Sequence, residues 1–384
     1  MAKKEVEVHG FCDKRFEPVK EAFIKNFEEG LEVGASFAAT INGNFVIDIW
    51  AGYADAERTR LWKENTIVNV YSTTKIMTAL CTLMLADRGL INLEAPVAKY
   101  WPEFAQSGKE KIPVKYLLSH SAGLSGYDKP MKKEDLYDWD RSVELLAEQK
   151  PMWEPGTKSG YHAVTFGQLL GEIVRRVSGK TLGTFFRDEV TSKVDADFHI
   201  GFTEDIDSRV ADLVPPTSDQ QQGFEELQSN TLFMKALFNP ILTYEDTRTR
   251  EWRAAEIPAS NGHGNARSIA KVGSILANGG KFEGIQFLSN QMIEKAIEEQ
   301  ISGVDLVLMN PIRFGLGFGL NSPKLLIPRG SNPRTFYWGG LGGSMCVMDP
   351  DAKLCYAYAM NQIVLSLTGD PRTKRIVEVI HELV

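Results

Sequence analysis

The amino-acid sequence predicts an α/β fold of the α+β type, in which strands from both ends of the chain build one mostly antiparallel sheet flanked by helices. Runs of β-forming residues occur near both ends, in GASFAATINGNFVIDIWAGYAD (residues 34–55) and in RTFYWGG, SMCVM and LCYAYAM (between residues 334 and 360). From about residue 90 to 310 the pattern is mainly helices and long loops. We therefore expect a discontinuous sheet domain (1–90 and 311–384), a mainly helical inserted region (91–310), and the active site in the cleft between them.

Three segments in the N-terminal part support this prediction. Apolar residues recur at helical spacing over residues 16–30, and Gly30 is typical of a helix end. The dipeptide Asn42-Gly43 separates two β-rich runs, which is the strongest short signal for a hairpin. A strongly apolar helix then begins near Ser72 and is expected to end at Gly89.

The rest of the chain continues this alternation. Helical periodicity is visible at residues 116–118, 143–146 and 166–177. Near the end, Asp370 is suited to cap a helix whose first turn contains Pro371.

Composition restricts the possible partners. The chain has 384 residues, of which 43% are hydrophobic and 24% charged, with a net charge of -7. These values are typical of a soluble globular protein, and without a basic tract we expect no nucleic-acid partner. No apolar run is long enough to span a membrane, and no signal-peptide core is visible, so we expect a cytoplasmic protein without a membrane partner. The four cysteines are widely spaced, which fits a reducing compartment.

Ser72 and Lys75 lie three residues apart at the start of the apolar helix. A serine hydroxyl attacks a carbonyl only when a partner takes its proton. A spacing of three places both side chains on one helix face, where the free amides of the first turn can stabilise an oxyanion. The pair is therefore a candidate nucleophile and base. The alternative is a serine that only caps a helix.

The same S-x-x-K spacing occurs at Ser268 and Lys271, so the pattern alone is not specific. Context distinguishes the two copies. Ser72 follows the apolar run TIVNVY and precedes a helix that is apolar nearly all round, whereas Ser268 lies after the polar, glycine-rich stretch NGHGNA. We expect the chemistry at Ser72.

Two further segments contain candidate site residues. In WEPGTKSGYH (residues 153–162), Tyr161 lies on a short loop before a helix. It is either a packing residue or a general acid/base whose pKa is lowered by a nearby cation. In TFYWGGLGGSMCVM (residues 335–348), clustered glycines mark either a tight turn between strands or a close approach by a ligand.

Taken together and in this order, the three segments resemble the serine β-lactamase and penicillin-binding-protein superfamily. They are most similar to class C β-lactamases and family VIII carboxylesterases. Supporting stretches are LLSHSAGL (117–124), NGHGNARSIAKVGSILANGG (261–280) and FGLGFGL (314–320). The resemblance covers most of the chain and implies the β-lactamase/transpeptidase-like fold.

The resemblance also implies roles for single residues. Ser72 would be the acylated nucleophile, Lys75 its activating partner, and Tyr161 the residue that moves protons to and from the leaving group. Residues 338–340 fall where β-lactamases have K-T-G. The backbone amide of Leu341 would complete an oxyanion hole with that of Ser72.

Departures from the family pattern concern the substrate. His162 and Ala163 replace the serine and asparagine that follow the tyrosine in class C enzymes, which removes an amide able to hold an acylamino group. Trp338 replaces the K-T-G lysine, so a cationic contact is missing and an apolar wall is present instead. W-G-G is similar to the esterase branch. We expect His162, Trp338, Gly339 and Gly340 to contact an uncharged ester.

The sequence thus predicts a serine hydrolase, a carboxylesterase for small uncharged esters that acts through an acyl-enzyme. We expect no cofactor and no metal. A β-lactamase, D-alanyl peptidase or transacylase of the same fold is the first alternative. A catalytically silent binding or scaffold protein on this fold is the second. The sequence contains no signal for an oligomeric state.

Overall fold

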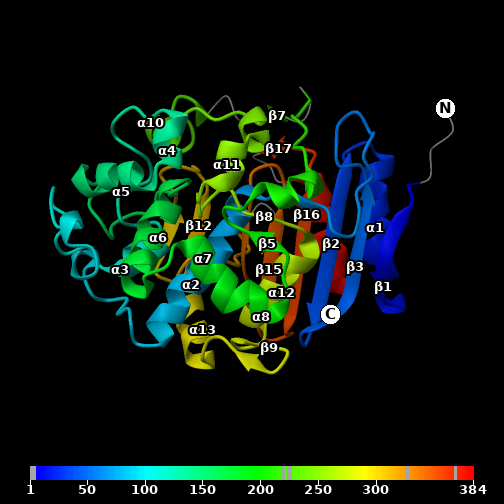
Figure 1. Ribbon diagram of the computed structural model, residues 1–384. Coiled ribbons are helices and arrows are strands. Elements are labelled where there is room, and N and C mark those ends of the chain that lie inside the picture. The colour runs from blue at the N-terminus through cyan, green and yellow to red at the C-terminus, as the bar shows by residue number, and fades with distance from the viewer. Residues whose placement is uncertain (1–5, 218–220, 223–226, 326–328, 367–369) are drawn as a thin grey trace.

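The computed structural model of the chain describes residues 6–217, 221–222, 227–325, 329–366 and 370–384. Its central element is a nine-stranded antiparallel sheet in the order β1-β3-β2-β16-β15-β14-β13-β12-β11 (Figure 1). Its strands are β1 (Val8–Cys12), β2 (Gly34–Ile41), β3 (Asn44–Gly52), β11 (Ile301–Val304), β12 (Pro311–Phe314), β13 (Gly319–Leu320), β14 (Phe336–Gly339), β15 (Met345–Asp349) and β16 (Leu354–Met360).

This sheet joins the N- and C-terminal parts of the chain. β2 and β3 form the predicted hairpin, and the two turn residues Asn42 and Gly43 have positive φ angles of 53° and 79°. A two-residue turn of this kind matches the twist of the flanking strands. β2 then pairs with β16 over its full length, from Ile41 opposite Leu354 to Ala35 opposite Met360. The predicted α+β fold, with one sheet built from both ends of the chain, is confirmed.

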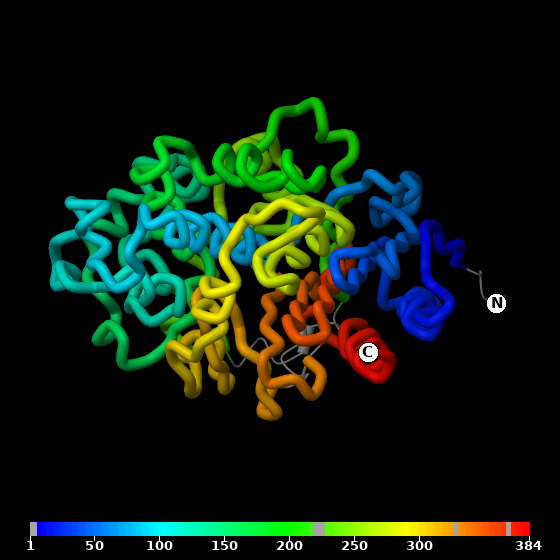
Figure 2. Tube along the Cα trace, turned by 90° about the horizontal axis from the view of Figure 1, so that it is seen from below, coloured from blue at the N-terminus to red at the C-terminus, as the bar shows by residue number. Residues whose placement is uncertain are grey.

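Helices cover both faces of the sheet. α12 (Ala266–Ala277) packs on β2, β15 and β16. α1 (Glu17–Glu28) and α14 (Pro371–Glu382) pack against each other, and Figure 2 shows α14 and α12 on opposite sides of the strands. The Asp370 side chain accepts a hydrogen bond from the amide of Arg372, and Pro371 is the first residue of α14, as expected.

The remaining helices lie mostly between β3 and β11 in the sequence. α2 (Lys75–Asp87) is buried over nearly its whole length, as its apolar sequence requires, and it packs on α6 (Thr165–Ser178). The others are α3 (Val114–Leu118), α4 (Lys133–Tyr137), α5 (Trp139–Glu148), α7 (Leu182–Phe186), α8 (Ser192–Val194), α10 (Thr231–Leu237), α11 (Arg250–Ala254) and α13 (Asn290–Ile297). The division into two domains stays a prediction, and β11 already belongs to the sheet although it precedes residue 311.

A four-stranded sheet holds the segment before α2. Its strand order is β5-β8-β4-β6, made of β5 (Phe198–His199), β8 (His263–Gly264), β4 (Ile67–Asn69) and β6 (Val210–Ala211). Two short pairs complete the strands, β9 (Lys281–Phe282) with β10 (Ile285–Gln286) and β7 (Gln221–Gln222) with β17 (Leu365–Ser366). β4 lies between β8 and β6 and pairs with both. These pairings hold the chain in place shortly before α2 begins.

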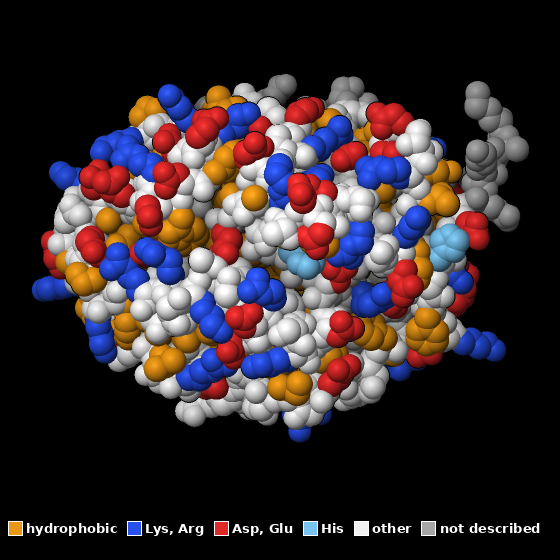
Figure 3. All heavy atoms as spheres, viewed as in Figure 1, with side chains coloured by type: hydrophobic (Ala, Val, Ile, Leu, Met, Phe, Trp, Pro, Cys, Tyr) orange, Lys and Arg blue, Asp and Glu red, His pale blue; other side chains and the backbone are white. Residues whose placement is uncertain are grey.

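The face of the molecule drawn in Figure 3 carries both positively and negatively charged side chains. Figure 3 shows lysine and arginine side chains interspersed with aspartate and glutamate over this face, without a continuous basic stripe. A search of the described residues for a helix with the length and apolar character of a membrane span finds none.

Candidate active site

Ser72 lies in a short 3-10 helix, η2 (Tyr71–Thr74), which continues directly into α2. The residue before it, Tyr71, has a φ angle of 42°, a left-handed conformation that is strained for an aromatic residue. The Thr74 hydroxyl maintains this turn, because it donates to the Tyr71 carbonyl (2.5 Å) and accepts from the Gly262 amide (2.9 Å). Thr74 occupies the N-cap position of α2. Ser72 is therefore not the cap of that helix.

The Lys75 side chain, only 1% exposed, has three hydrogen-bond partners. Its Nζ lies 3.1 Å from Ser72 Oγ, and it donates to the carbonyls of Ala163 (2.6 Å) and Ala259 (2.9 Å). Burial lowers the pKa of this amine well below its usual value of 10.5. A neutral amine has two N–H groups for the two carbonyls, and its lone pair then faces the serine hydroxyl.

The phenol of Tyr161 completes the cluster. It is hydrogen-bonded with Ser72, and the Trp338 indole N–H donates to its oxygen at 3.3 Å. Lys75 Nζ lies 4.8 Å from the centre of the Tyr161 ring. Burial raises the pKa of the phenol, while the hydrogen bonds with Ser72 and Trp338 act in the opposite direction. The structure thus brings together a hydroxyl, an amine, a phenol and an indole from three segments that are distant in the sequence.

Two buried histidines fix the loop that carries Tyr161. The His120 carbonyl accepts from the Gly160 amide (2.9 Å), and His120 Nδ1 accepts from the His162 amide (3.1 Å). His162 Nδ1 bonds the Gly160 carbonyl (2.7 Å), and its Nε2 accepts from the Leu124 amide (3.2 Å). Burial lowers the pKa of His162 to about 3, so the ring is neutral. Both its nitrogens are engaged within the protein, and the substrate contact expected of His162 stays a prediction.

The turn between β14 and β15 lies against the start of α2. The Ser344 hydroxyl donates to the Val70 carbonyl (2.8 Å) and is hydrogen-bonded to the Thr73 hydroxyl (2.9 Å). Gly340 is required here, because a Cβ at this position would lie 2.1 Å from the Val70 carbonyl oxygen. Across the described residues, no hydrogen bond to a protein acceptor is found for the amide of Ser72 or of Leu341. Two such amides can hold an oxyanion.

Sequence reasoning could not place the region from about residue 200 to 260, and part of that region supports the site. The buried Trp252 indole donates to Asn69 Oδ1 (2.8 Å), and Asn69 Nδ2 donates to the Ser260 carbonyl (3.1 Å). These bonds hold the end of β4, three residues before Ser72. Residues 218–220 and 223–226 of the region lie outside the described part of the chain.

The second S-x-x-K copy has a purely local role. Ser268 and Asn265 form a capping box at the start of α12, in which Ser268 Oγ accepts from the Asn265 amide (3.1 Å). Lys271 Nζ instead donates to the Asp195 carbonyl (2.6 Å). Ser268 and Lys271 do not share a hydrogen bond in the described part of the chain, whereas Ser72 and Lys75 do.

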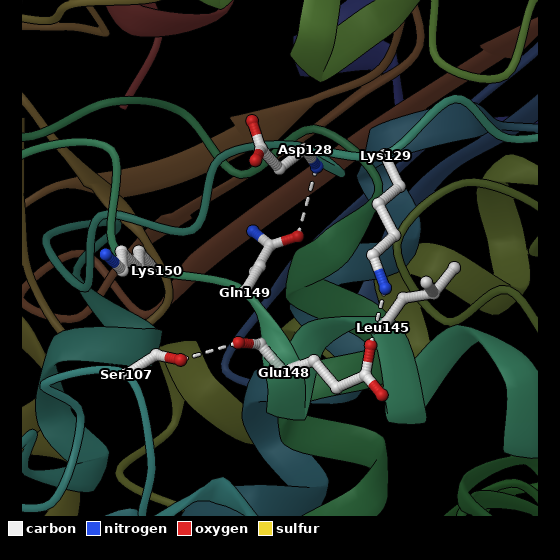
Figure 4. A pocket seen from close by; sticks show the side chains of 7 residues that line it. All are labelled: Ser107, Asp128, Lys129, Leu145, Glu148, Gln149 and Lys150. Atoms are coloured by element: carbon white, nitrogen blue, oxygen red, sulfur yellow. Dashed lines mark hydrogen bonds and ion pairs between the residues drawn. The ribbon is translucent and has the colours of Figure 1, made fainter.

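A cavity of about 310 Å³ opens elsewhere, at the C-terminal end of α5. Figure 4 shows its lining, in which Lys129 pairs with Glu148 (2.7 Å) and Gln149 Oε1 accepts from the Asp128 amide (3.1 Å). The lining residues are Ser107, Asp128, Lys129, Leu145, Glu148, Gln149 and Lys150. None of them is a predicted site residue, so this cavity is separate from the Ser72 cluster.

Comparison with known proteins places these observations in a family. The Beta-lactamase family matches residues 23–378. Esterase/beta-lactamase LipL of Mycobacterium tuberculosis is 34% identical over 370 residues, which are 94% of this chain and 84% of that protein. Esterase EstB of Burkholderia gladioli is 26% identical, with 88% of each chain covered.

Solved structures agree with this assignment. The crystal structure of a family VIII carboxylesterase is similar with a TM-score of 0.91 and 43% sequence identity, covering 98% of this chain and 100% of that one. The resemblance that the motifs predicted is therefore confirmed, and this chain belongs to the Beta-lactamase family.

Proposed function

We propose that this chain is a serine hydrolase, a carboxylesterase that cleaves small uncharged esters through an acyl-enzyme on Ser72. The observation that carries the proposal is the environment of the Lys75 amine, which contacts two carbonyls and the Ser72 hydroxyl. Burial without a carboxylate among these partners favours the uncharged amine, which can accept a proton. The esterase names of LipL and EstB, and the family VIII carboxylesterase structure, support the same class.

In the first step, Ser72 Oγ forms a bond to the ester carbonyl carbon while its proton moves to the Lys75 amine. The carbonyl π electrons move onto the oxygen, and the amides of Ser72 and Leu341 donate to the resulting oxyanion. The oxyanion then collapses and the bond to the alkoxide breaks. Tyr161 donates its proton to the alkoxide and recovers one from the Lys75 ammonium, so the alcohol leaves uncharged.

Water then attacks the acyl-enzyme by the reverse route. Tyr161 and Lys75 take a proton from the water while the water oxygen bonds the acyl carbon. The bond between that carbon and Ser72 Oγ then breaks, the proton returns to Ser72 Oγ, and the acid leaves. Each cycle consumes one ester and one water and regenerates the free site. Acyl transfer differs only in that a second alcohol or an amine replaces the water.

The preference for uncharged esters rests on Trp338. Where β-lactamases have the K-T-G lysine, this chain presents an indole that is 7% exposed and donates to Tyr161 rather than to a substrate carboxylate. The aromatic surface favours an apolar acyl or alcohol group. We also propose that the site lies in the cleft between the sheet and the helical region. Location in the cytoplasm stays a prediction from the sequence.

A fluorophosphonate probe and a panel of p-nitrophenyl esters test the proposal together. We expect one phosphonyl group per chain, located on Ser72 by peptide mass spectrometry, and hydrolysis of short-chain esters. Ser72→Ala should abolish both. Ser268→Ala is the matched control, since it removes the serine of the other S-x-x-K copy from a helix cap and should keep labelling and turnover.

Nitrocefin, assayed beside the ester panel, tests the first alternative function, and the labelling result tests the second. A kcat/KM for nitrocefin well above that for aryl esters would assign a β-lactamase to this site. Absence of labelling at Ser72 in folded wild-type protein, with no ester turnover, would leave only a binding or scaffold role.

A further inference from the structure

Asp305 is a fully buried carboxylate in the turn between β11 and β12. Its Oδ1 accepts from three backbone amides, those of Tyr161 (3.1 Å), Val307 (2.9 Å) and Leu308 (2.9 Å). Its Oδ2 is buried without a hydrogen-bond partner in the described part of the chain. A buried charge in such a place is costly, and amide donors are what make it tolerable.

Hydrogen bonds within the backbone close the turn that carries Asp305. The Asp305 amide donates to the Asn310 carbonyl (3.0 Å), and the Met309 amide donates back to the Asp305 carbonyl (2.9 Å). The turn is also attached from outside, because the Asn230 side chain donates to the Leu306 carbonyl (2.9 Å). A turn that is held in this way can fix the position of the group that its carboxylate binds.

Asp305 and its neighbour Leu306 hold the loop that contains Tyr161, the proposed acid/base. The Leu306 amide donates to the Ser159 carbonyl (2.9 Å), two residues before Tyr161, while the Asp305 carboxylate takes the amide of Tyr161 itself. The histidines described above hold the amides of Gly160 and His162. The amides of Gly160, Tyr161 and His162 therefore each have an acceptor in the protein. The acceptor of the Tyr161 amide is a carboxylic acid side chain.

We propose that Asp305 is a positioning residue for Tyr161, which fixes the catalytic phenol through its backbone amide and places a negative charge beside the loop that carries it. The inference rests on the proposed function, because it assigns Tyr161 the role of proton donor. Asp305 touches neither Ser72 nor the reacting atoms and acts only through Tyr161.

The electrostatic part follows from the groups around the phenol. Burial raises the pKa of Tyr161 most, the hydrogen bonds with Ser72 and Trp338 oppose this, and the charge of Asp305 raises the pKa further. The other titratable groups that face the ring are Lys75 and His120, and burial lowers the pKa of both, which favours their uncharged forms. In the resting site, the charge of Asp305 thus adds to the effect of burial, which is the larger cause.

Two substitutions separate position from charge. Asp305→Asn keeps an oxygen for the three amides and removes the charge, so the alkaline decline of kcat should begin at a lower pH than in wild type. Asp305→Ala also releases the loop, and kcat should fall about 100-fold with KM nearly unchanged, as a misplaced catalytic group costs. Ester turnover across pH is measured for both.

Asp349 offers a matched control. It is a buried aspartate at the end of β15 and accepts from the amides of Asp351 and Ala352 (3.0 Å each). Asp349→Asn and Asp349→Ala should lower stability without moving the pH profile. If Asp305→Ala does not fold, Asn230→Ala loosens the same turn with the carboxylate in place, and kcat should fall while the alkaline decline stays where it is.

Asp305 variants that match the Asp349 variants in kcat and pH profile would overturn the inference. The proposed function would stand in that case, provided that wild-type Ser72 is still labelled. Failure of wild-type labelling would instead remove the proposed function itself.

Discussion

Burial acts in opposite directions on the two titratable side chains that contact Ser72. It lowers the pKa of Lys75 well below its usual value and raises the pKa of Tyr161 above its own. Burial therefore favours the uncharged form of both groups. An uncharged amine is a base and an uncharged phenol is an acid, so one hydrophobic environment prepares both for proton transfer without an ion pair.

Trp338 contributes a single donor to this pair. Trp338→Phe keeps an aromatic ring against Tyr161 but removes the indole N–H that bonds its oxygen. A hydrogen bond of this kind contributes about 1 kcal/mol, so we expect kcat for a p-nitrophenyl ester to fall about fivefold to tenfold. Tyr337→Phe, one residue earlier in β14, is the control. Equal kcat in the two variants would show that the indole donor has no part in turnover.

At the scale of elements, the site depends on one contact between the β14–β15 turn and the start of α2. Ser344 bridges the two through Val70 and Thr73. These hydrogen bonds connect the turn that contains Leu341 to the segment that contains Ser72. An oxyanion hole made of two backbone donors needs this kind of support, because its donors have no side chain to adjust.

Gly340→Ala tests that contact. The added methyl would lie 2.1 Å from the Val70 carbonyl oxygen and 2.4 Å from Ser344 Oγ, so the turn must move away from α2. We expect kcat to fall by about 100-fold or more, as loss of an oxyanion donor does, while Ser72 stays in place. Gly284→Ala, where a methyl meets nothing within 4 Å, controls for stability loss alone and should keep kcat. Normal turnover by Gly340→Ala would exclude this turn from the site.

At the scale of the whole molecule, one buried arginine connects distant segments. Arg372 of α14 donates to Glu32 (2.9 Å), to Asp370 (2.6 Å) and to the carbonyls of Gln362 (2.8 Å) and Gly342 (2.5 Å). Arg372 and Glu32 are both fully buried. The guanidinium thus joins the segment after α1, the C-terminal helix and the turn that carries Leu341.

Removal of this guanidinium leaves buried carboxylates without their partner. We expect Arg372→Met to lower the free energy of unfolding in urea by about 3–5 kcal/mol, and a second change, Glu32→Gln, to recover part of the loss. Lys374→Met, which breaks an exposed pair with Glu378 on the same helix, should change it by less than about 1 kcal/mol. A small effect of Arg372→Met, similar to that of Lys374→Met, would mean that the network does not hold the molecule together.

Local signals explain which features could be predicted. The Asn42-Gly43 hairpin, the Asp370 cap and the apolar α2 depend on residues close in sequence, and each follows from its pattern. The two S-x-x-K copies differ in the burial of their lysines, since Lys75 is buried and Lys271 is half-buried, and the chemistry expected at Ser72 stays a prediction.

Long-range partners could not be predicted in this way. Asp305 meets Tyr161 across 144 positions and Arg372 meets Glu32 across 340, and a lone acidic or basic residue carries no local mark of such a contact. His162 shows the converse limit. Its position next to Tyr161 is visible in the sequence, but the hydrogen bonds of its ring with Gly160 and the Leu124 amide are not.

The pairing of early and late segments has a consequence for biosynthesis. Thr73 and Ser344, which hydrogen-bond beside the nucleophile, are 271 positions apart. A ribosome-bound chain therefore displays Ser72, Lys75 and Tyr161 long before it has Trp338 or Leu341, and it also lacks the β16 edge that β2 needs. We therefore expect such a half-made chain to be inert toward esters. On this expectation, ester hydrolysis begins only after translation has passed β16 and the last strands have docked.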